Sequence, residues 1–316
     1  MLSARRRIAP YLQPTPLYRY AALDELVGAR VRVKHENHQP IGAFKVRGGV
    51  NLVSQLSEDE RRRGIVTAST GNHGQSIAYA AGLFGVQATI CVPEGANPLK
   101  VASIHGLGAD VVFHGRDFDD ARVHAEELER EHGYRYVHSG DEPLLIAGVA
   151  TETLEILEQE PETDAIVVPV GGGSGAAGAC IVAKAVDAGV EVIGVQSAAA
   201  PAAYRAWSER RPVEDVMNTY AEGLATRVAF ELPQRILREH LDEFVLVSDD
   251  EIRSAQRLMI ETTRNLVEAA GAAPLAGALH LRERLAGKRV VLVLSGGNAS
   301  RAELLAALGE AEAPSG

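Results

Sequence analysis

A lysine stands at the expected start of a helix, among small residues that could let a ligand approach. The segment reads Gln39-Pro40-Ile41-Gly42-Ala43-Phe44-Lys45-Val46-Arg47-Gly48-Gly49. Burial and the positive end of a helix both lower the pKa of a lysine amine. An amine of this kind can form a Schiff base with a carbonyl group. On this segment alone, an ordinary surface lysine remains the favoured interpretation.

A second segment, Ser69-Thr70-Gly71-Asn72-His73-Gly74, directly follows the expected strand Ile65–Ala68. Small hydroxyl residues and glycines at a helix start expose backbone N–H groups, which form a nest for a carboxylate or another anion. The side chain of Asn72 could bind a ligand hydroxyl. Ser, Thr and Asn also cap helices, so a plain N-cap turn explains the segment equally well.

Four glycines within five residues mark a third segment, between an expected strand and an expected helix. It reads Pro169-Val170-Gly171-Gly172-Gly173-Ser174-Gly175. Glycine is costly in chain entropy, and a plain strand–helix turn requires only one or two of them. The start of a helix is a ready binding site for a phosphate. The segment therefore predicts a phosphate-binding loop.

The same glycines also fit a dinucleotide-binding pattern, G-x-G-x-x-G, from Gly173 to Gly178. That fold places an acidic residue for the ribose at the end of the next strand, whereas Gln196 follows the expected strand Val190–Val195. No lysine follows the glycines, which disfavours a phosphate-loop NTPase. A dinucleotide-binding oxidoreductase stays as a distant alternative.

A fourth segment again places a hydroxyl and two glycines after a strand. It reads Leu294-Ser295-Gly296-Gly297-Asn298 and follows the apolar run Arg289–Leu294. In open α/β sheets, ligands bind at the carboxyl ends of the strands, so a second group of ligand contacts is expected here. Another simple turn is the alternative. The ten histidines form no zinc motif and no cluster with cysteine, and no metal site is predicted.

These segments lie within a regular alternation of β-branched runs and alanine-rich helical stretches. The expected strands are Val31–His35, Ile65–Ala68, Ala88–Val92, Val111–Phe113, Ala165–Val170, Val190–Val195, Phe244–Val247 and Arg289–Leu294. The expected helices are Phe44–Gln55, Gly74–Leu83, Pro98–His105, Phe118–His132, Leu144–Gln159, Gly175–Asp187, Asp249–Asn265 and Pro274–Leu285. The alternation predicts an α/β fold with open, parallel-rich sheets flanked by helices on both faces.

The order of the elements predicts a smaller domain nested within a larger one. We expect the small domain at residues 63–138 and the large domain at residues 1–58 and 142–316. The residues after Gly309 are expected to fray.

The chain of 316 residues carries a net charge of −10 and shows no basic face, so no nucleic-acid partner is expected. Its two cysteines, Cys91 and Cys180, lie in apolar runs and are interpreted as buried free thiols of a reducing compartment. The N-terminus has no signal pattern, and no apolar run is long enough to span a bilayer. A cytoplasmic protein without a membrane partner is predicted.

Together the four segments resemble the serine/threonine dehydratase and serine racemase group of fold-type II pyridoxal-phosphate (PLP) enzymes. The resemblance covers almost the whole chain, in the order and spacing of that group. It implies a nested two-domain α/β fold, a PLP cofactor and a homodimer.

The resemblance also implies roles for individual residues. The group's Schiff-base lysine is matched by Lys45, with Phe44 beside it at the cofactor. Its Ser-x-Gly-Asn-His loop is matched by Ser69, Thr70, Gly71, Asn72 and His73, which would receive the substrate carboxylate, while Asn72 would also contact the cofactor's phenolic oxygen. The phosphate loop is matched by Gly171, Gly172, Gly173, Ser174 and Gly175. Ser295 matches the serine that faces the pyridine nitrogen, and Glu268 matches a glutamate near the ring.

The activity implied is β-elimination of water and ammonia from a β-hydroxy-amino acid such as L-serine or L-threonine. Hydroxyaspartate and phenylserine are possible substrates, because the side-chain pocket is not readable from the sequence. A racemase or β-replacement enzyme on the same scaffold is the nearest alternative, and a non-catalytic ligand-binding relative is another. A neutral hydroxyl at the ring nitrogen would favour prompt elimination.

The chain departs from the group's pattern at several positions. Ser174 replaces a fourth glycine, Gly175 replaces a larger apolar residue, and Ala43 replaces a serine. Thr70 stands where the racemase has its opposite-face serine, and its methyl group would crowd that face. The segment 196–202 has no carboxylate where metal-binding relatives have theirs, so no divalent ion is expected there. The matched segments end near the C-terminus, so no regulatory domain is expected after them.

Overall fold

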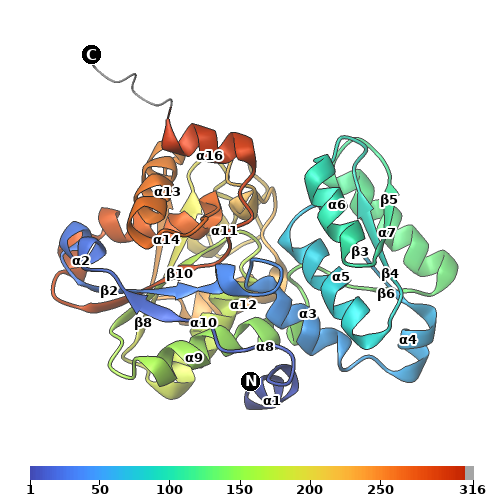
Figure 1. Ribbon diagram of the computed structural model, residues 1–316, viewed down its shortest axis with the longest axis horizontal. Helices are drawn as coiled ribbons and strands as arrows, with labels where there is room; N and C mark the ends of the chain where they lie inside the picture. Colours follow the sequence, from blue (N-terminus) through green and yellow to red (C-terminus); the bar gives the residue numbers. More distant parts are fainter. Residues whose placement is uncertain (310–316) are drawn as a thin grey trace. The chain divides into compact units, whose positions relative to one another are not determined.

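The computed structural model describes residues 1–309, and the segment expected to fray after Gly309 lies outside these residues. The chain divides into two compact units, each packed mainly within itself (Figure 1). The first unit comprises Met1–Gln13 and Gln39–Thr151, and the second comprises Pro14–His38 and Glu152–Gly316. The two units alternate along the sequence, because residues 14–38 of the second unit separate the two parts of the first.

The first unit contains a sheet of four parallel strands in the order β5-β4-β3-β6. Its strands are β3 (Ile65–Ala68), β4 (Ala88–Val92), β5 (Asp110–Phe113) and β6 (Arg135–Tyr136). Its helices are α1 (Leu2–Ile8), α3 (Lys45–Val53), α4 (Glu58–Arg63), α5 (Asn72–Phe84), α6 (Pro98–Gly106), α7 (Phe118–His132) and α8 (Pro143–Val149).

Helices cover both faces of this sheet, because successive side chains of a strand point in opposite directions. Ile65 and Ile90 pack with the apolar residues of α5 in one cluster. Val66 and Cys91, each one residue further along its strand, pack against α7 in another cluster. Both faces are therefore buried, which explains why these strands are solidly apolar.

The second unit contains a sheet of six strands in the order β1-β2-β10-β7-β8-β9. The strands are β1 (Leu17–Arg19), β2 (Arg30–His35), β7 (Ala165–Pro169), β8 (Glu191–Ser197), β9 (Glu243–Val247) and β10 (Arg289–Leu294). Only β1, at the edge, runs antiparallel to its neighbour. The helices are α2 (Ala21–Val27), α9 (Thr151–Gln159), α10 (Ser174–Val186), α11 (Ala202–Ser208), α12 (Glu231–His240), α13 (Asp249–Thr263), α14 (Ala269–His280), α15 (Arg282–Leu285) and α16 (Arg301–Leu308), with 3-10 turns η1 (Glu36–His38) and η2 (Glu222–Leu224).

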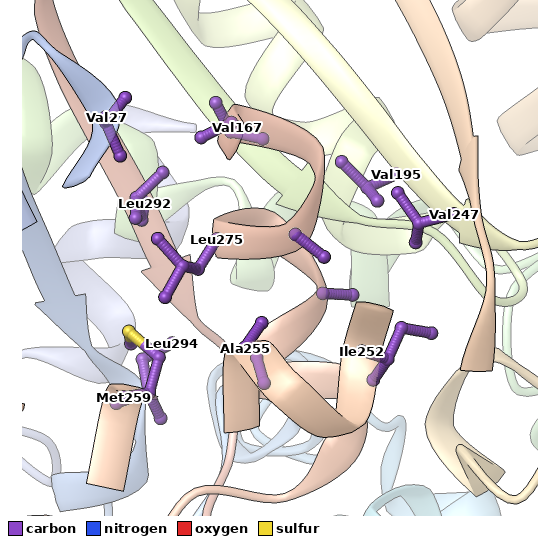
Figure 2. Packing of buried hydrophobic residues seen from close by; sticks show 14 of the residues in the cluster. Val27, Val167, Val195, Val247, Ile252, Ala255, Met259, Leu275, Leu292 and Leu294 are labelled. Atoms are coloured by element: carbon purple, nitrogen blue, oxygen red, sulfur yellow. The ribbon is translucent and has the colours of Figure 1, made fainter. Parts of the chain in front are cut away.

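The largest apolar core of the second unit lies between its sheet and the helices α13 and α14 (Figure 2). Val167, Val195 and Val247 contribute one face of three strands, while Leu275 and Met259 contribute from the helices. Each of these residues is almost completely buried. This core holds the strand ends on which the glycine loop and Ser295 are placed.

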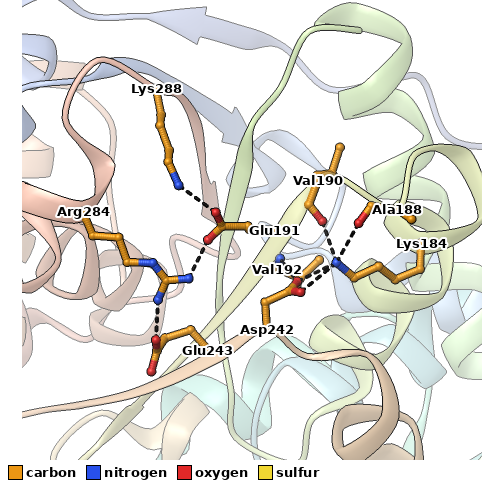
Figure 3. Close-up of polar contacts among 9 residues, drawn as sticks. All are labelled: Lys184, Ala188, Val190, Glu191, Val192, Asp242, Glu243, Arg284 and Lys288. Carbon is orange, nitrogen blue, oxygen red and sulfur yellow. Dashed lines mark hydrogen bonds and ion pairs between the residues drawn. The ribbon is translucent and has the colours of Figure 1, made fainter.

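Charged residues join the strand starts at the opposite edge of this sheet (Figure 3). Glu191, at the start of β8, accepts hydrogen bonds of 2.6 Å from both Arg284 and Lys288. Asp242, just before β9, pairs with Lys184 at 2.7 Å and accepts the backbone N–H of Val192. These contacts fix the register of neighbouring strands at their N-terminal ends. The glycine loop and Ser295 follow the opposite, carboxyl ends of the strands.

The structure confirms the predicted α/β fold with open, parallel-rich sheets, and it corrects two predicted helices. The predicted helix Leu144–Gln159 is interrupted at Ala150, between α8 and α9. The hydroxyl of Thr151 donates to the carbonyl of Gly148 at 2.7 Å, which favours a helix end there. The predicted start at Pro274 is wrong, because α14 begins at Ala269 and Pro274 lies inside the helix.

The two compact units differ from the predicted domain boundaries at residues 1–13, 39–58 and 142–151, which lie in the first unit. The cause is local: α3 packs closely against both α5 and α8. The assignment of folding domains stays a prediction. Both cysteines are buried and free, as the sequence predicted, and no helix within residues 1–309 is long and apolar enough to cross a membrane.

Candidate active site

Lys45 is the first residue of α3, as the sequence predicted. The preceding residue, Phe44, already has helical backbone angles and makes no side-chain cap. The lysine amine lies 5.3 Å from the centre of the Phe44 ring, within the range of a cation–π contact. The motif thus places the amine at the positive end of a helix and against an aromatic face.

Close packing at glycines fixes the position of α3. A Cβ atom at Gly49 would lie 2.4 Å from the hydroxyl of Ser76 on α5, and a Cβ atom at Gly148 on α8 would lie 2.4 Å from the carbonyl oxygen of Arg47. Ser76 donates a hydrogen bond of 2.7 Å to the carbonyl of Lys45 itself. Gly49 on α3 and Gly148 on α8 therefore allow α5 and α8 to pack closely against the backbone of α3.

The amine of Lys45 is desolvated although part of its side chain remains accessible. Burial lowers the pKa of Lys45 from 10.5 to about 8. The amine approaches the carbonyl oxygen of Ser139 at 3.5 Å, at the outer limit of a hydrogen bond. A lowered pKa increases the neutral, nucleophilic fraction at pH 7 from roughly 1 in 3000 to roughly 1 in 10. This is the form that reacts with a carbonyl group.

His73 lies buried near the same amine and is held as a neutral ring. Its Nε2 atom is 3.0 Å from the hydroxyl of Thr67, and that hydroxyl donates to the carbonyl of Val137. Nε2 must therefore carry a proton and donate to Thr67. Burial, with a smaller effect of the charge on Lys45, lowers the pKa of His73 to about 3. A second positive charge beside Lys45 is thereby avoided at neutral pH.

The segment from Ser69 to His73 joins β3 to α5 and leaves the helix start without a side-chain cap. Ser69, Thr70, Gly71 and Asn72 are partly exposed, whereas His73 is buried. The hydroxyl of Ser69 accepts the N–H of Gly71 at 3.2 Å. Because α5 is 13 residues long and uncapped, its first N–H groups can bind a carboxylate.

The glycine loop joins β7 to α10 in the second unit, and Gly173 is the uncapped N-cap residue of that helix. Gly173 has a φ angle of +87°, which strongly favours glycine. A Cβ atom at Gly171 would lie 2.2 Å from the carbonyl oxygen of Gly223, and one at Gly172 would lie 2.2 Å from the ring of Phe230. The protein's own backbone and packing thus require these three glycines.

Ser174 and Gly175 form the first turn of α10, and Ser174 is buried. The loop therefore presents the N–H groups at the start of a 13-residue helix to an anion. From the sequence, a bound ligand was the only reason expected for the four glycines. The structure shows that the segment from Gly223 to Phe230 also shapes the loop.

Ser295 directly follows β10 and is buried. Gly296 follows Ser295, and its carbonyl accepts the backbone N–H of Glu268 at 3.1 Å. Glu268 is also the N-cap residue of α14, without a side-chain cap bond, and it is partly exposed. The structure thus brings the two residues that were matched to the ring side of the cofactor into one cluster of the second unit.

Sequence reasoning missed several residues of this environment. In the first unit these are Thr67, Ser76 and the turn His138–Asp141, in which Nδ1 of His138 accepts the N–H groups of Gly140 and Asp141 at 3.1 and 2.8 Å. The small residues Ser139 and Gly140 after β6 were the available signal, because they repeat the pattern seen at the other strand ends. Gly223 and Phe230 in the second unit carried no recognisable signal.

The comparisons decide the family. Residues 8–296 match the family described as "Pyridoxal-phosphate dependent enzyme". The chain belongs to this family. It is 36% identical over 299 residues to an L-threo-3-hydroxyaspartate ammonia-lyase of Saccharomyces cerevisiae, covering 94% of this chain and 92% of that one.

Solved structures agree. The processed form of threonine deaminase isoform 2 from Solanum lycopersicum matches with a TM-score of 0.92 and 30% identity, covering 97% of this chain and 92% of that one. Serine racemase from Dictyostelium discoideum matches with a TM-score of 0.90 and 34% identity, covering 95% and 97%. The chain is therefore a PLP-dependent enzyme with the fold-type II architecture, and the dinucleotide alternative is wrong.

The residues present fit PLP. A desolvated amine with a lowered pKa suits the aldehyde of the cofactor, and an uncapped helix start behind closely packed glycines suits its phosphate. These donors also explain how a chain with a net charge of −10 can bind an anionic cofactor, because backbone N–H groups supply the partial positive charge.

Proposed function

We propose that this enzyme eliminates water from a β-hydroxy-amino acid and releases a 2-keto acid and ammonia. The observation that carries the proposal is Lys45, whose amine is desolvated at the first turn of α3 in a chain of the PLP family. Relatives described as L-threonine ammonia-lyase and L-threo-3-hydroxyaspartate ammonia-lyase, at 36–38% identity, support the reaction class.

Each part of the cofactor has a proposed partner. Lys45 holds the aldehyde, with Phe44 beside it and Asn72 at the phenolic oxygen. The loop Gly171–Gly175 holds the phosphate, and Ser295 faces the ring nitrogen, with Glu268 near the ring. When bound, PLP supplies an electron sink for negative charge at the substrate Cα.

The remaining steps depend on the chain's own residues. The N–H groups at the start of α5, with Ser69 and Thr70, bind the substrate carboxylate. The amine of Lys45, once free, removes the Cα proton, and its lowered pKa makes this base available near neutral pH. The hydroxyl leaves from Cβ as water, and the resulting enamine tautomerises and hydrolyses to the keto acid and ammonia. His73, held neutral, adds no charge that would compete for the carboxylate.

The substrate class is β-hydroxy-amino acids, with serine, threonine and 3-hydroxyaspartate as the first members to test. Phenylserine and other β-substituted amino acids remain alternatives on the same scaffold. Racemisation is a second candidate, favoured by the likeness to a serine racemase. It requires a proton donor on the opposite face of Cα, and Thr70 is the residue that we assign to that position.

Other features remain predictions. The homodimer and the absence of a divalent ion come from the resemblance, and the cytoplasmic location comes from the sequence pattern. Near segment 196–202, the carboxylate of Asp249 accepts hydrogen bonds of 2.7 Å from both Ser197 and Thr219. Within residues 1–309, no group of three or more His, Cys, Asp or Glu residues could hold a metal.

A keto-acid release assay over L-serine, L-threonine, 3-hydroxyaspartate and phenylserine tests the function, with chiral analysis of the recovered amino acid. We expect elimination to exceed racemisation for at least one of them. Lys45→Ala should abolish turnover and the visible absorbance of lysine-bound cofactor while the protein stays folded. Lys100→Ala, which removes another lysine of the first unit, is the matched control. Near-normal turnover by Lys45→Ala would refute the proposal.

A further inference from the structure

A pocket of about 250 Å³ lies on the second unit, away from the proposed active site. Four arginines line it: Arg19 of β1, Arg30 and Arg32 of β2, and Arg289 of β10. Glu160 and Glu162, which follow α9, complete the polar lining. Arg289 begins the strand that ends just before Ser295, and six residues of strand span roughly 20 Å. The pocket is therefore distinct from the cofactor and substrate residues.

The register of the strands places all four arginines on one face of the sheet. Arg19 lies opposite Arg32 in the antiparallel pair of β1 and β2. Arg289 lies opposite Arg30 in the parallel pair of β10 and β2. Arg30 and Arg32 are two residues apart on one strand, so their side chains leave the same face. The sheet thus holds two directly opposed pairs of like charges, an arrangement that is destabilising by itself.

Carboxylates balance this charge only in part. Arg32 pairs with Glu160, and Arg19 pairs with Asp24 at 2.6 Å. Arg289 pairs with Glu162 at 3.0 Å, but the Glu162 side chain is 70% exposed, and such a surface pair contributes little. The guanidinium of Arg30 has no hydrogen-bond or ion-pair partner within residues 1–309. The pocket is a positive region on a chain with a net charge of −10.

We propose that this pocket binds a small phosphate-bearing anion. A phosphate dianion offers three acceptor oxygens, which can bridge the guanidinium groups of Arg30 and Arg289 while Glu162 swings into solvent. It would neutralise the opposed pair that no carboxylate of the chain neutralises fully. The volume holds roughly eight waters, which suits phosphate with a small substituent rather than a larger ligand.

Calorimetric titration of the holoenzyme with inorganic phosphate tests the proposal, because bound PLP already fills the glycine loop. Sodium chloride keeps the ionic strength constant. We expect saturable binding, and Arg30→Gln and Arg289→Gln should each weaken it by about tenfold or more, since each removes charge-assisted hydrogen bonds. A parallel titration with glycerol 3-phosphate shows whether free phosphate or a phosphate ester binds more tightly.

Arg6→Gln is the matched control, because it removes one exposed arginine from α1, outside the pocket. It should leave phosphate binding unchanged. Without phosphate, Arg30→Gln should be at least as stable as the parent, because it relieves a like-charge pair. Two outcomes would overturn the proposal: no saturable binding at constant ionic strength, or full binding by both pocket variants. Neither outcome depends on the catalytic function.

Discussion

Replacement of Lys45 by methionine should stabilise the apoenzyme, in a way that depends on pH. Burial lowers the pKa of Lys45 from 10.5 to about 8, so the folded state carries a charged amine at a cost. That cost is about 1.36 kcal/mol for each pH unit by which the pKa is lowered, or about 3 kcal/mol at pH 7. Partial exposure of the side chain makes this an upper value. Methionine keeps the length of the side chain without its charge.

The sign of the pH dependence follows from the same lowered pKa. Between the two pKa values the unfolded chain binds more protons than the folded chain, so the parent becomes more stable as the pH rises from 8 to 10.5. The advantage of Lys45→Met should therefore shrink from about 3 kcal/mol at pH 7 to about 1.4 kcal/mol at pH 9.5. Above pH 10.5 it should vanish.

Urea unfolding of the two apoenzymes at several pH values measures this difference directly, and Lys100→Met serves as the control for loss of a lysine charge. A gain below about 1 kcal/mol at pH 7 would mean that the amine is well solvated. A gain that stays constant up to pH 10 would mean that methionine stabilises by packing alone. Either result would remove the physical basis for treating Lys45 as an activated amine.

Four further outcomes are expected. The elimination rate at saturating substrate should rise with pH through about 8 and then level, because the base form of Lys45 is required; a flat profile from pH 6 to 9 would contradict this. Gly172→Ala should weaken PLP affinity, because the new Cβ would lie 2.2 Å from the ring of Phe230. Adding Phe230→Leu to this variant should restore part of the affinity. Equal PLP affinities of the parent and Gly172→Ala would show that the loop can shift freely. Thr67→Val should destabilise the protein by about 1–3 kcal/mol, because the buried N–H of His73 loses its acceptor, whereas Thr67→Ser should not; thermal melts compare the two. Lys34→Met should lower the free energy of unfolding in urea by about 3–5 kcal/mol, because Glu155 loses its buried partner at 2.7 Å. The double variant with Glu155→Leu should recover most of this loss. Additive losses in the two single variants and the double variant would be inconsistent with a coupled pair.

The sheets were predictable because their signals are local. Solid runs such as Ile65–Ala68 report burial on both faces, and Gly133 ends α7 in the left-handed conformation, as its position suggested. The helix starting at Ala269 was not predictable in this way. Its first five residues are alanine and glycine, and they are helical because they pack against the segment around Gly296, which is distant in sequence. Proline at position 274 then suggested a false start.

In the candidate site, too, some features are readable from local sequence and others depend on packing between distant segments. Lys45, the loop from Ser69 to His73, the glycine loop and Ser295 were proposed as site residues because each follows or precedes an element in a recognisable pattern. The direction of the Lys45 pKa shift was expected, but its size and the pKa of His73 were not readable, since they depend on desolvation by residues from several elements. The same holds for Phe230, which contacts Gly172 only through the fold. Sequence patterns therefore indicated the candidate groups, whereas packing sets the pKa values of Lys45 and His73.

A common physical feature of the proposed site residues is that none besides Lys45 carries a full positive charge. His73 is held neutral by burial, the pKa of the Lys45 amine is lowered to about 8, Ser295 is an uncharged hydroxyl, and the starts of α5 and α10 offer only partial charges. A full positive charge beside the lysine would lower its pKa further but would also compete for the substrate carboxylate. Partial charges from helix starts bind two anionic groups without that competition. The arginine pocket is the contrast: full charges stand opposed there, at the far end of β10, where the proposed reaction does not take place.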